Sequence, residues 1–418
     1  MQMGQPVCDS DMELEQHCRS CGGSTFELLN LGDQPLANNL SLSPGAPVET
    51  FPLAVRVCDR CSLAQLSYCV DKEVLYSDYN YVTPESVELT RHYGEVYDFL
   101  RENGHIGPES MVLDIGSNIG RLLEFLKPRV KSVLGIDPAQ NIVDLAIDRH
   151  IPTFCRFFNE ASAREIDEAF GKQDAIFARH CFAHNEDPGQ ILAGIPQVLA
   201  PEGVMVIENA YFRDTVEKCE FDQIYHEHMY YYNLRGLGGI LQSHGLKLVD
   251  AHHSDVHGGT IVFVAKLAAS PTEPSGRVRD YLASEAGMHR PEYYERFVSQ
   301  TWRNRNALRH LVDELHAEGK TIHAYGASAK ATTLLNYYGI TAAQVPFVVD
   351  FTPEKIGKYV PLANIQVISE EEAAKDPPDY YLLTIWNYRD EVIRKVRAAG
   401  NTRTRFILPH PDVEIVEA

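Results

Sequence analysis

The sequence predicts an α/β fold built from three units, and three features of the chain lead to this prediction. Two C-x-x-C pairs lie near the N-terminus, an apolar strand followed by a glycine turn and a helix begins at Met111, and the same order of elements begins again at Thr321. Strands that alternate with helices in this way are typical of parallel sheets covered by helices. We expect the three units to span residues 1–85, 86–275 and 276–418.

The length and composition are those of a globular protein with more than one core. The chain has 418 residues, of which 44% are hydrophobic and 23% are charged, and this length suits two or three domains. Its formal net charge of −20 argues against nucleic acid as a partner, because phosphate backbones are bound by basic surfaces. No apolar run reaches the roughly 18 residues of a membrane span, and the first residues lack the pattern of a signal peptide. We therefore expect a cytoplasmic enzyme that binds no membrane.

Four of the nine cysteines have the spacing of a metal site. Cys18 and Cys21 form one C-x-x-C pair, in CRSCGGS, and Cys58 and Cys61 form the second, in CDRCSL. Two such pairs supply four thiolates, which is a ligand set of structural zinc. We expect a closed, non-catalytic Zn²⁺ site that replaces the core that so short a segment cannot build.

The second unit contains the pattern of a nucleoside-binding sheet edge. The strand Met111–Ile115 has Asp114 near its end, Gly116 and Gly120 flank the turn into a helix, and the next strand ends at Asp137. In open parallel sheets a glycine turn of this kind faces the ligand, and the acid after the second strand binds ribose hydroxyls.

The turn itself favours a cofactor that lacks a diphosphate. Where the dinucleotide motif G-x-G-x-x-G has its central glycine, this chain has Asn118, preceded by Ser117. That glycine lets the backbone approach a pyrophosphate, which S-adenosylmethionine (SAM) does not have. The sequence therefore favours SAM over NAD, and apolar stretches within residues 174–184 and 203–211 supply the next strands.

An unusual stretch, CEFDQIYHEHMYYY, occupies residues 219–232. Its acids, histidines and phenols suit proton transfer, a metal site or a polar aromatic loop. His226 and Glu227 do not have the i, i+4 spacing of ligands on a helix. Beside a SAM site we favour proton transfer by a histidine and a phenol.

The third unit follows a linker rich in Ser, Pro and Gly at residues 266–278. A helix with Phe297 and Leu308 among its apolar positions leads to TIHAYGASAKATTLLNYYGI, which repeats the strand–glycine–helix order with Ser328 and Lys330 at the turn. A helix N-terminus beside small residues and a lysine suits an anion, although a half-domain of this kind can also serve packing alone.

In this order the motifs resemble those of the sugar-nucleotide C-methyltransferases of deoxysugar pathways. The resemblance runs from about Cys18 to the C-terminus and rests on C-x-x-C…C-x-x-C, DIGSNIG, EFDQIYHEHMYYYNLRGL, VHGGTIVF and YGASAKATTLLNYYGI. It implies a zinc-binding N-terminal module, a SAM-binding Rossmann-like domain and a Rossmann-like C-terminal α/β domain that helps to hold the substrate. It also implies methylation at C3 of a dTDP-linked 4-keto-6-deoxy sugar through an enolate.

The resemblance further implies roles for individual residues. His228 would be the base, Tyr225 the donor to the keto oxygen and Glu227 an orienting or proton-handling partner, while Tyr79 would close over the pocket. The implied cofactor-binding residues are Asp114, Gly116, Ser117, Asn118, Gly120, Asp137, Asn159 and His184. The implied substrate-binding residues are Tyr81, His184, His257, Gly258, Ser328, Lys330 and Asn387.

Other interpretations remain open from the sequence. An O- or N-methyltransferase would use His228 on a heteroatom, and a scaffold would bind SAM without turnover. Asn159 fits an ordinary loop as well as an adenine pocket, and His184 fits a helix cap as well as a substrate pocket. Nothing in the chain requires more than a monomer or a weak homo-oligomer.

Overall fold

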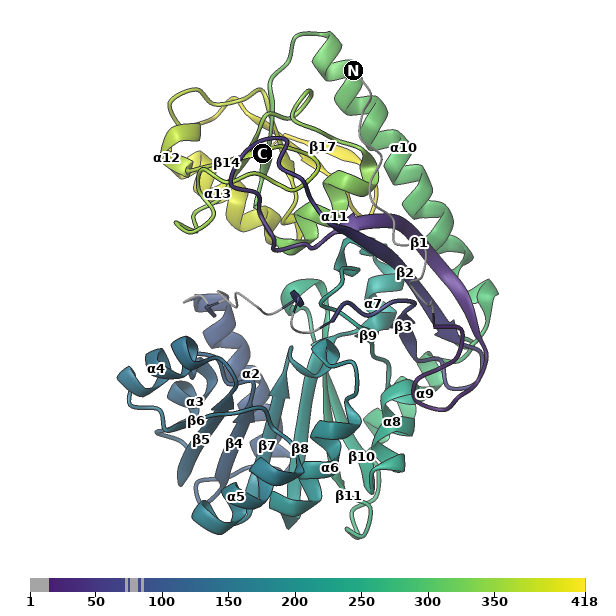
Figure 1. The fold of residues 1–418 in the computed structure, drawn as a ribbon, viewed down its shortest axis with the longest axis vertical. Coiled ribbons are helices and arrows are strands. Elements are labelled where there is room, and N and C mark those ends of the chain that lie inside the picture. Colours follow the sequence, from purple (N-terminus) through teal and green to yellow (C-terminus); the bar gives the residue numbers. More distant parts are fainter. Residues whose placement is uncertain (1–14, 72–73, 76–81, 84–85, 418) are drawn as a thin grey trace.

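The computed structural model describes residues 15–71, 74–75, 82–83 and 86–417. They form three β-sheets with helices packed against them (Figure 1), and this confirms the predicted α/β fold with two Rossmann-like parts. Tyr79 and Tyr81 lie outside the described residues. Within the described ranges no helix combines the length and the apolar character that a bilayer crossing needs.

The N-terminal sheet has four antiparallel strands in the order β1-β2-β3-β9. These strands are β1 (Thr25–Pro35), β2 (Thr50–Cys58), β3 (Ala64–Leu66) and β9 (Tyr230–Tyr231). The last strand belongs to the tyrosine-rich stretch, where Tyr230 pairs with Gln65 and Tyr231 pairs with Ala64. The stretch that the sequence singles out for chemistry is therefore fixed to the N-terminal module, which the sequence analysis did not predict.

The central sheet has seven strands in the order β10-β11-β8-β7-β4-β5-β6, in which β11 runs opposite to all the others. Its strands are β4 (Met111–Ile115), β5 (Ser132–Asp137), β6 (Thr153–Cys155), β7 (Gln173–Arg179), β8 (Leu199–Ala210), β10 (Leu246–Ser254) and β11 (Thr260–Leu267). Val112 and Leu113 are fully buried in hydrophobic clusters on opposite faces of this sheet. Both faces are covered, and this is why β4 reads as a continuous apolar run.

Helices and short 3₁₀ turns surround the central sheet. The α-helices are α2 (Val87–Glu102), α3 (Arg121–Leu126), α4 (Gln140–Asp148), α5 (Glu160–Phe170), α6 (Gly189–Val198), α7 (Phe212–Glu217), α8 (Leu234–Ser243) and α9 (Gly276–Ser284). The 3₁₀ turns are η1 (Phe182–His184), η2 (Phe221–Gln223) and η3 (Val256–Gly258). The helix α2 begins after Ser86, whose hydroxyl accepts the amide of Leu89 as an N-cap.

The C-terminal sheet has six strands in the order β14-β13-β12-β15-β16-β17, all parallel except β17. Its strands are β12 (Ile322–Tyr325), β13 (Phe347–Val349), β14 (Gln366–Ile368), β15 (Tyr380–Leu383), β16 (Arg405–Leu408) and β17 (Glu414–Val416). Its helices are η4 (Pro291–Tyr294), α10 (Glu295–Ala317), α11 (Ala329–Tyr338), α12 (Glu370–Ala373), η5 (Trp386–Tyr388) and α13 (Arg389–Ala398).

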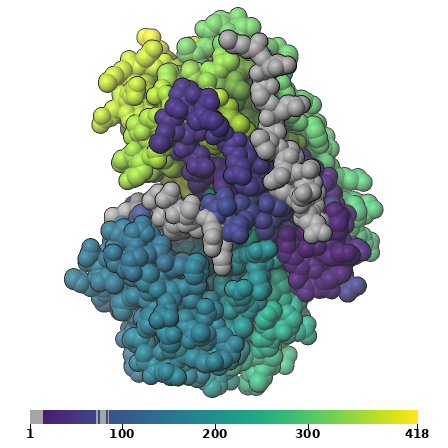
Figure 2. All heavy atoms as spheres, in the orientation of Figure 1, coloured from purple at the N-terminus to yellow at the C-terminus, as the bar shows by residue number. Residues whose placement is uncertain are grey.

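The N-terminal module also contacts the C-terminal part. Val55 of β2 shares a hydrophobic cluster with Leu308 of α10 and Leu335 of α11, and Figure 1 shows β1 and β2 beside α10. The Thr332 hydroxyl donates to the carbonyl of Ala37 at 2.8 Å, and in Figure 2 the loop after β1 covers part of the C-terminal domain. The module therefore packs against both larger parts of the chain.

We propose 1–85, 86–275 and 276–418 as the domain limits. At the second limit, Ser275 and Arg277 both donate to the buried carboxylate of Asp250 on β10. The first helix after the linker, α9, is thereby attached to the central sheet.

Candidate active site

The four cysteines predicted to bind zinc come together at the end of β2. Cys18 lies 3.6 Å from Cys61, and Cys21 lies 3.5 Å from Cys58 and 3.7 Å from Cys61, measured between sulfur atoms. All four sulfurs lie within 4.8 Å of one another. Sulfurs placed tetrahedrally around zinc at about 2.3 Å would be roughly 3.8 Å apart, so this cluster fits the ion.

Local backbone geometry supports the same assignment. The amides of Arg60 and Cys61 each point at the sulfur of Cys58, at 3.4 Å. A Cβ atom at Gly23 would lie 3.2 Å from that sulfur and 3.3 Å from the sulfur of Cys21. The small residue after the first pair is therefore what allows the chain to wrap around the thiolates.

The turn between β4 and α3 has the predicted shape of a cofactor edge. Gly116 has a φ of 67°, and a Cβ atom there would lie 2.9 Å from the Cβ of Cys181. Asn118 has a φ of 50°, a left-handed conformation that asparagine tolerates better than most residues. The turn thus has a left-handed backbone at a position that also carries a polar side chain.

The two acids of this edge are both buried. Asp137 accepts the backbone amides of Asn118 and Ala139, each at 3.0 Å, and burial still raises its pKa. Burial raises the pKa of Asp114 to about 7, against the opposing effect of Arg179. Each oxygen of Asp137 accepts one of these bonds and has capacity for a second, so the carboxylate fits the predicted ribose contact.

Three further predicted cofactor residues have clear structural surroundings. The Ser117 hydroxyl is buried and has no hydrogen-bond partner among the described residues, which suits a position next to a polar ligand. Gly120 begins α3 with a φ of 78° and packs against Ile151. The side-chain oxygen of Asn159 accepts hydrogen bonds from the two backbone amides of Ala161 and Ser162 and forms a capping box at the start of α5. This oxygen is therefore used to cap the helix.

The predicted catalytic pair is formed within the tyrosine-rich stretch. The hydroxyl oxygen of Tyr225 lies 2.7 Å from Nε2 of His228, and Nδ1 of His228 lies 2.9 Å from the carbonyl oxygen of Gln223. A carbonyl only accepts, so Nδ1 carries the proton and the Tyr225 hydroxyl donates to the lone pair on Nε2. This arrangement leaves His228 with one basic nitrogen, directed at a phenol.

The histidine pair at this position is held in the neutral form. Burial lowers the pKa of His228 well below its usual value, and the nearby His184 lowers it further. The two rings lie 5.2 Å apart between centroids, and burial lowers the pKa of His184 to about 4. A neutral imidazole is the form that can accept a proton.

Glu227 has a different neighbour from the one expected. Its carboxylate accepts a hydrogen bond from Nδ2 of Asn38 at 2.6 Å, and burial raises its pKa. The ring of His228 is oriented instead by the carbonyl of Gln223. Glu227 therefore links the stretch to the loop after β1.

His226 points away from this pair and into the N-terminal module. It is 1% exposed, its Nε2 lies 3.2 Å from the carbonyl oxygen of Phe51, and the two rings meet edge to face. Burial lowers its pKa to about 4, although the bond to Phe51 opposes that shift. His226 is a structural residue in this arrangement.

The position of His226 predicts a loss of stability at mildly acidic pH. The unfolded chain would protonate it near pH 6.5, whereas the folded chain keeps it neutral to about pH 4. The unfolded state therefore binds up to one more proton at this residue between these values, and the contribution of His226 to stability should fall by at most about 1.4 kcal/mol for each pH unit as the pH decreases. Chemical denaturation from pH 7 to pH 4 measures this slope.

A matched pair of variants tests the origin of the slope. His226→Gln should reduce it by up to about 1.4 kcal/mol for each pH unit, while His310→Gln, at an exposed position of α10, should leave it unchanged. Equal slopes in His226→Gln and the wild type would assign the acid sensitivity to other groups.

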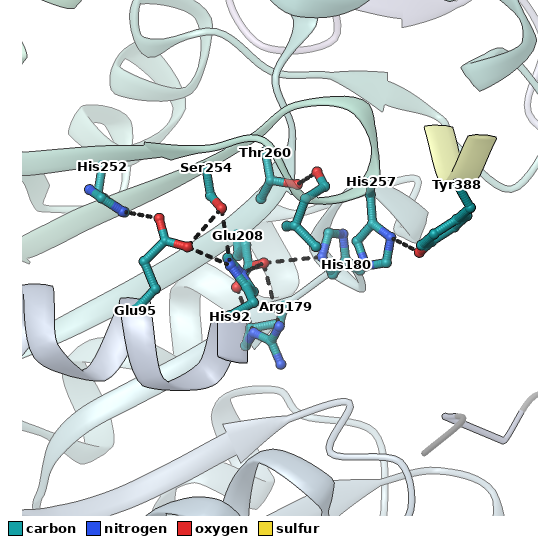
Figure 3. A network of polar contacts seen from close by, with 11 residues as sticks. His92, Glu95, Arg179, His180, Glu208, His252, Ser254, His257, Thr260 and Tyr388 are labelled. Atoms are coloured by element: carbon teal, nitrogen blue, oxygen red, sulfur yellow. Dashed lines mark hydrogen bonds and ion pairs between the residues drawn. The ribbon is translucent and has the colours of Figure 1, made fainter. Parts of the chain in front are cut away.

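A buried polar network lies at the carboxyl ends of β7 and β8 (Figure 3). Glu208, which is fully buried, binds Arg179 at 2.6 Å, His92 at 2.7 Å and His180 at 3.2 Å. Although burial alone would raise it, these partners hold the pKa of Glu208 well below its usual value. This network was not predicted from the sequence, in which the polar residues that end two apolar strands were the available signal.

The network continues to the C-terminal domain through His257. The rings of His180 and His257 meet edge to face at 5.4 Å, and Nδ1 of His257 lies 3.0 Å from the Tyr388 hydroxyl (Figure 3). Burial lowers the pKa of His257 to about 3. A Cβ atom at Gly258 would lie 2.8 Å from the carboxylate of Glu220, so this predicted close approach is to a neighbouring side chain.

The predicted anion site at α11 is partly used by the chain itself. Ser328 caps α11, and the amide of Ala327 donates to the carboxylate of Asp350 at 2.8 Å. Lys330 differs, because its ammonium nitrogen is buried without a hydrogen-bond partner among the described residues and lies 5.1 Å from the centre of the Trp386 ring. Lys330 is therefore the group of this turn best placed to receive an anion.

Asn387 lies on the short turn η5, between two residues that reach the central domain. Trp386 donates its indole N–H to Asp222 at 2.8 Å, and Tyr388 contacts His257. Asn387 is partly exposed at this boundary.

Comparisons with known proteins cover almost the whole chain. Three family models match it: "Methyltransferase domain" over residues 89–251, "C-methyltransferase C-terminal domain" over 255–411, and "Putative zinc binding domain" over 18–76. A curated relative, "C-methyltransferase NovU" of Streptomyces niveus, is 36% identical over 406 residues, which are 96% of this chain and 97% of the relative.

Two solved structures resemble a part of the chain at low identity. A SAM-dependent methyltransferase from Clostridium acetobutylicum has a TM-score of 0.34 and 12% identity, with 47% of this chain and 96% of that chain covered. A magnesium protoporphyrin IX methyltransferase (ChlM) from Synechocystis, with bound SAM, has a TM-score of 0.35 and 13% identity, with 47% and 98% covered.

Proposed function

The chain belongs to the C-methyltransferase family, and we propose that it transfers a methyl group to C3 of a dTDP-linked 4-keto-6-deoxy sugar through an enolate. Family membership confirms the expected SAM-dependent methyltransferase with a zinc-binding N-terminal domain. It also favours a carbon nucleophile over the oxygen or nitrogen nucleophiles that the sequence left open. The sugar, the position and the enolate are our proposal.

The observation that carries the proposal is the hydrogen-bonded pair of Tyr225 and His228, at 2.7 Å. A carbon next to a ketone becomes a nucleophile when a base removes its proton and a donor stabilises the oxygen. We assign the first task to Nε2 of His228 and the second to the hydroxyl of Tyr225. In the free protein the Tyr225 hydroxyl and Nε2 of His228 are hydrogen-bonded to each other.

Substrate binding then requires the Tyr225 hydroxyl to exchange one hydrogen-bond partner for another. The Tyr225 hydroxyl turns from His228 to the keto oxygen, which frees the Nε2 lone pair for the proton at C3. The carbonyl of Gln223 remains bound to Nδ1 at 2.9 Å and stabilises the imidazolium that forms. The buried, neutral state of His228 keeps it ready to accept the proton.

SAM, when bound, supplies an electrophilic methyl group. The residues that would hold it are those of the β4–α3 turn, with Asp137 on the ribose hydroxyls and Asn118 and Gly116 shaping the backbone. His184, beside His228, would separate the methyl donor from the base. We place the diphosphate of the sugar nucleotide near Lys330, whose buried ammonium has no hydrogen-bond partner among the described residues.

The proposal predicts deuterium exchange next to the ketone. In D₂O, dTDP-4-keto-6-deoxy sugars should gain deuterium at C3, and added SAM should give a mass increase of one methyl group. Mass spectrometry and proton NMR of the sugar measure both. Methyl transfer to an oxygen or nitrogen without exchange at carbon would contradict the enolate, and the absence of both across a panel of sugars would contradict the substrate class.

A further inference from the structure

Trp386 of the C-terminal domain contacts the short turn η2 beside the proposed base. Trp386 stands at the start of η5, directly beyond the carboxyl end of β15. Its indole N–H donates to a carboxylate oxygen of Asp222 at 2.8 Å. Asp222 is fully buried, and among the described residues Trp386 supplies the one hydrogen bond to this carboxylate.

Asp222 is directly connected to the group that orients His228. It lies in η2 next to Gln223, whose carbonyl oxygen accepts the Nδ1 proton of His228 at 2.9 Å. Because η2 is a single tight turn, holding the side chain of Asp222 also restrains the backbone of the next residue, Gln223. The position of the Gln223 carbonyl decides which nitrogen of His228 keeps its proton.

A second residue of η5 is linked to Gln223 through His257. Tyr388 lies 3.0 Å from Nδ1 of His257, and the carbonyl of His257 accepts the side-chain amide of Gln223 at 3.1 Å. Gln223 is 4% exposed. Two residues of η5 thus contact the neighbours of Gln223, Trp386 at Asp222 and Tyr388 at His257.

We propose that Trp386 is a positioning residue for methyl transfer: its N–H holds Asp222, and this fixes the Gln223 carbonyl so that Nε2 of His228 is the basic nitrogen. The inference rests on the proposed role of His228 as the base. It gives the C-terminal domain a part in the chemistry in addition to substrate binding. The face of the same indole ring contacts Lys330, so the variant used as a test must retain an aromatic ring.

The chain contains two tryptophans, and this supplies a matched control. Trp386→Phe removes the N–H donor and keeps a ring beside Lys330. Trp302→Phe makes the same change at a half-exposed position of α10, where the ring meets Tyr337 edge to face. Zinc content and SAM affinity, equal in both variants and the wild type, establish that each protein is folded.

The first measurement needs no substrate. In protein labelled with ¹⁵N-histidine, the signals of His228 are assigned by their loss in His228→Asn. We expect a single neutral tautomer with the proton on Nδ1 in the wild type and in Trp302→Phe, and a mixture of tautomers in Trp386→Phe. An unchanged His228 spectrum in Trp386→Phe would overturn the inference.

The second measurement separates positioning from substrate binding. Trp386→Phe should lower kcat about 10-fold, because small displacements of a reacting group cost up to about 10²-fold, and should leave KM for the sugar nucleotide within about twofold. Asp222→Asn should lower kcat as well, and the double variant should lose less than the product of the two effects. A rise in KM without a fall in kcat would instead assign Trp386 to substrate binding and overturn the proposed role.

The two measurements also separate this inference from the proposed function. If the wild type neither exchanges deuterium into a keto sugar nor methylates it, the proposed function fails, and the histidine spectrum still decides whether Trp386 holds the ring of His228. If the wild type is active and Trp386→Phe matches it in rate and spectrum, the inference alone fails.

Discussion

His228→Asn is expected to lower the rate of methyl transfer by about 10²–10⁴-fold, the range typical of a lost general base. Asparagine has no nitrogen that accepts a proton at neutral pH, although it can still bond to Gln223 and Tyr225. The affinity for SAM should change by less than a few fold, because the base acts on the sugar after both substrates are bound. Initial rates at saturating substrate and calorimetric titration with SAM measure the two quantities.

Two further variants give this prediction its controls. His244→Asn changes a histidine at the end of α8, where it bonds to the helix carbonyl of Ile240, and should be nearly as active as the wild type. Tyr225→Phe should lower the rate by about 10²–10³-fold, as for a lost oxyanion donor, and should retain slow deuterium exchange. A rate for His228→Asn close to that of the wild type would remove His228 from the mechanism.

Local spacing was enough to predict the parts of the site that lie close together in the sequence. Cys18 and Cys21 are three residues apart, and the second pair has the same spacing. A four-thiolate site then needs only that the fold bring the two pairs together, as it does. The β4–α3 turn is likewise local, and Gly116, Asn118 and Gly120 all have positive φ angles. In both cases the chemistry follows from side-chain type and backbone constraint within a few residues.

Contacts between distant residues could not be predicted in this way. Glu227 was expected to serve His228, but it binds Asn38, which lies 189 positions earlier in the chain. The group that orients His228 is a backbone carbonyl, that of Gln223, and a carbonyl carries no sequence signal. Trp386 reaches Asp222 across 164 positions, so only the folded chain shows that η5 belongs to the site.

Electrostatic balance is a second property that composition does not reveal. The chain has a formal net charge of −20, yet the region between the central and C-terminal domains contains neutral histidines and the buried ammonium of Lys330. Burial lowers the pKa of His228 and of His257, and so the groups there present hydrogen-bonding nitrogens without carrying charge.

Cys58→Ser is expected to abolish stoichiometric zinc binding and to unfold the N-terminal module locally. Cys58 ends β2 and accepts two backbone amides at its sulfur, so its loss removes a ligand and leaves both amides without their acceptor. Structural zinc contributes about 10–16 kcal/mol in zinc-finger peptides, more than a module of this size can recover from its own core. Metal analysis and limited proteolysis measure the two effects.

The loss of zinc should also reach the active site, and this distinguishes the prediction from simple destabilisation. The module supplies the bond from Asn38 to Glu227 and pairs β3 with β9 beside His228, so methyl transfer should fall together with the zinc content. Cys155→Ser, at a thiol outside the cluster, should retain full metal and activity. One equivalent of zinc and an intact module in Cys58→Ser would contradict the four-thiolate site. Full activity in zinc-free protein would show instead that the module has no part in holding the catalytic stretch in place.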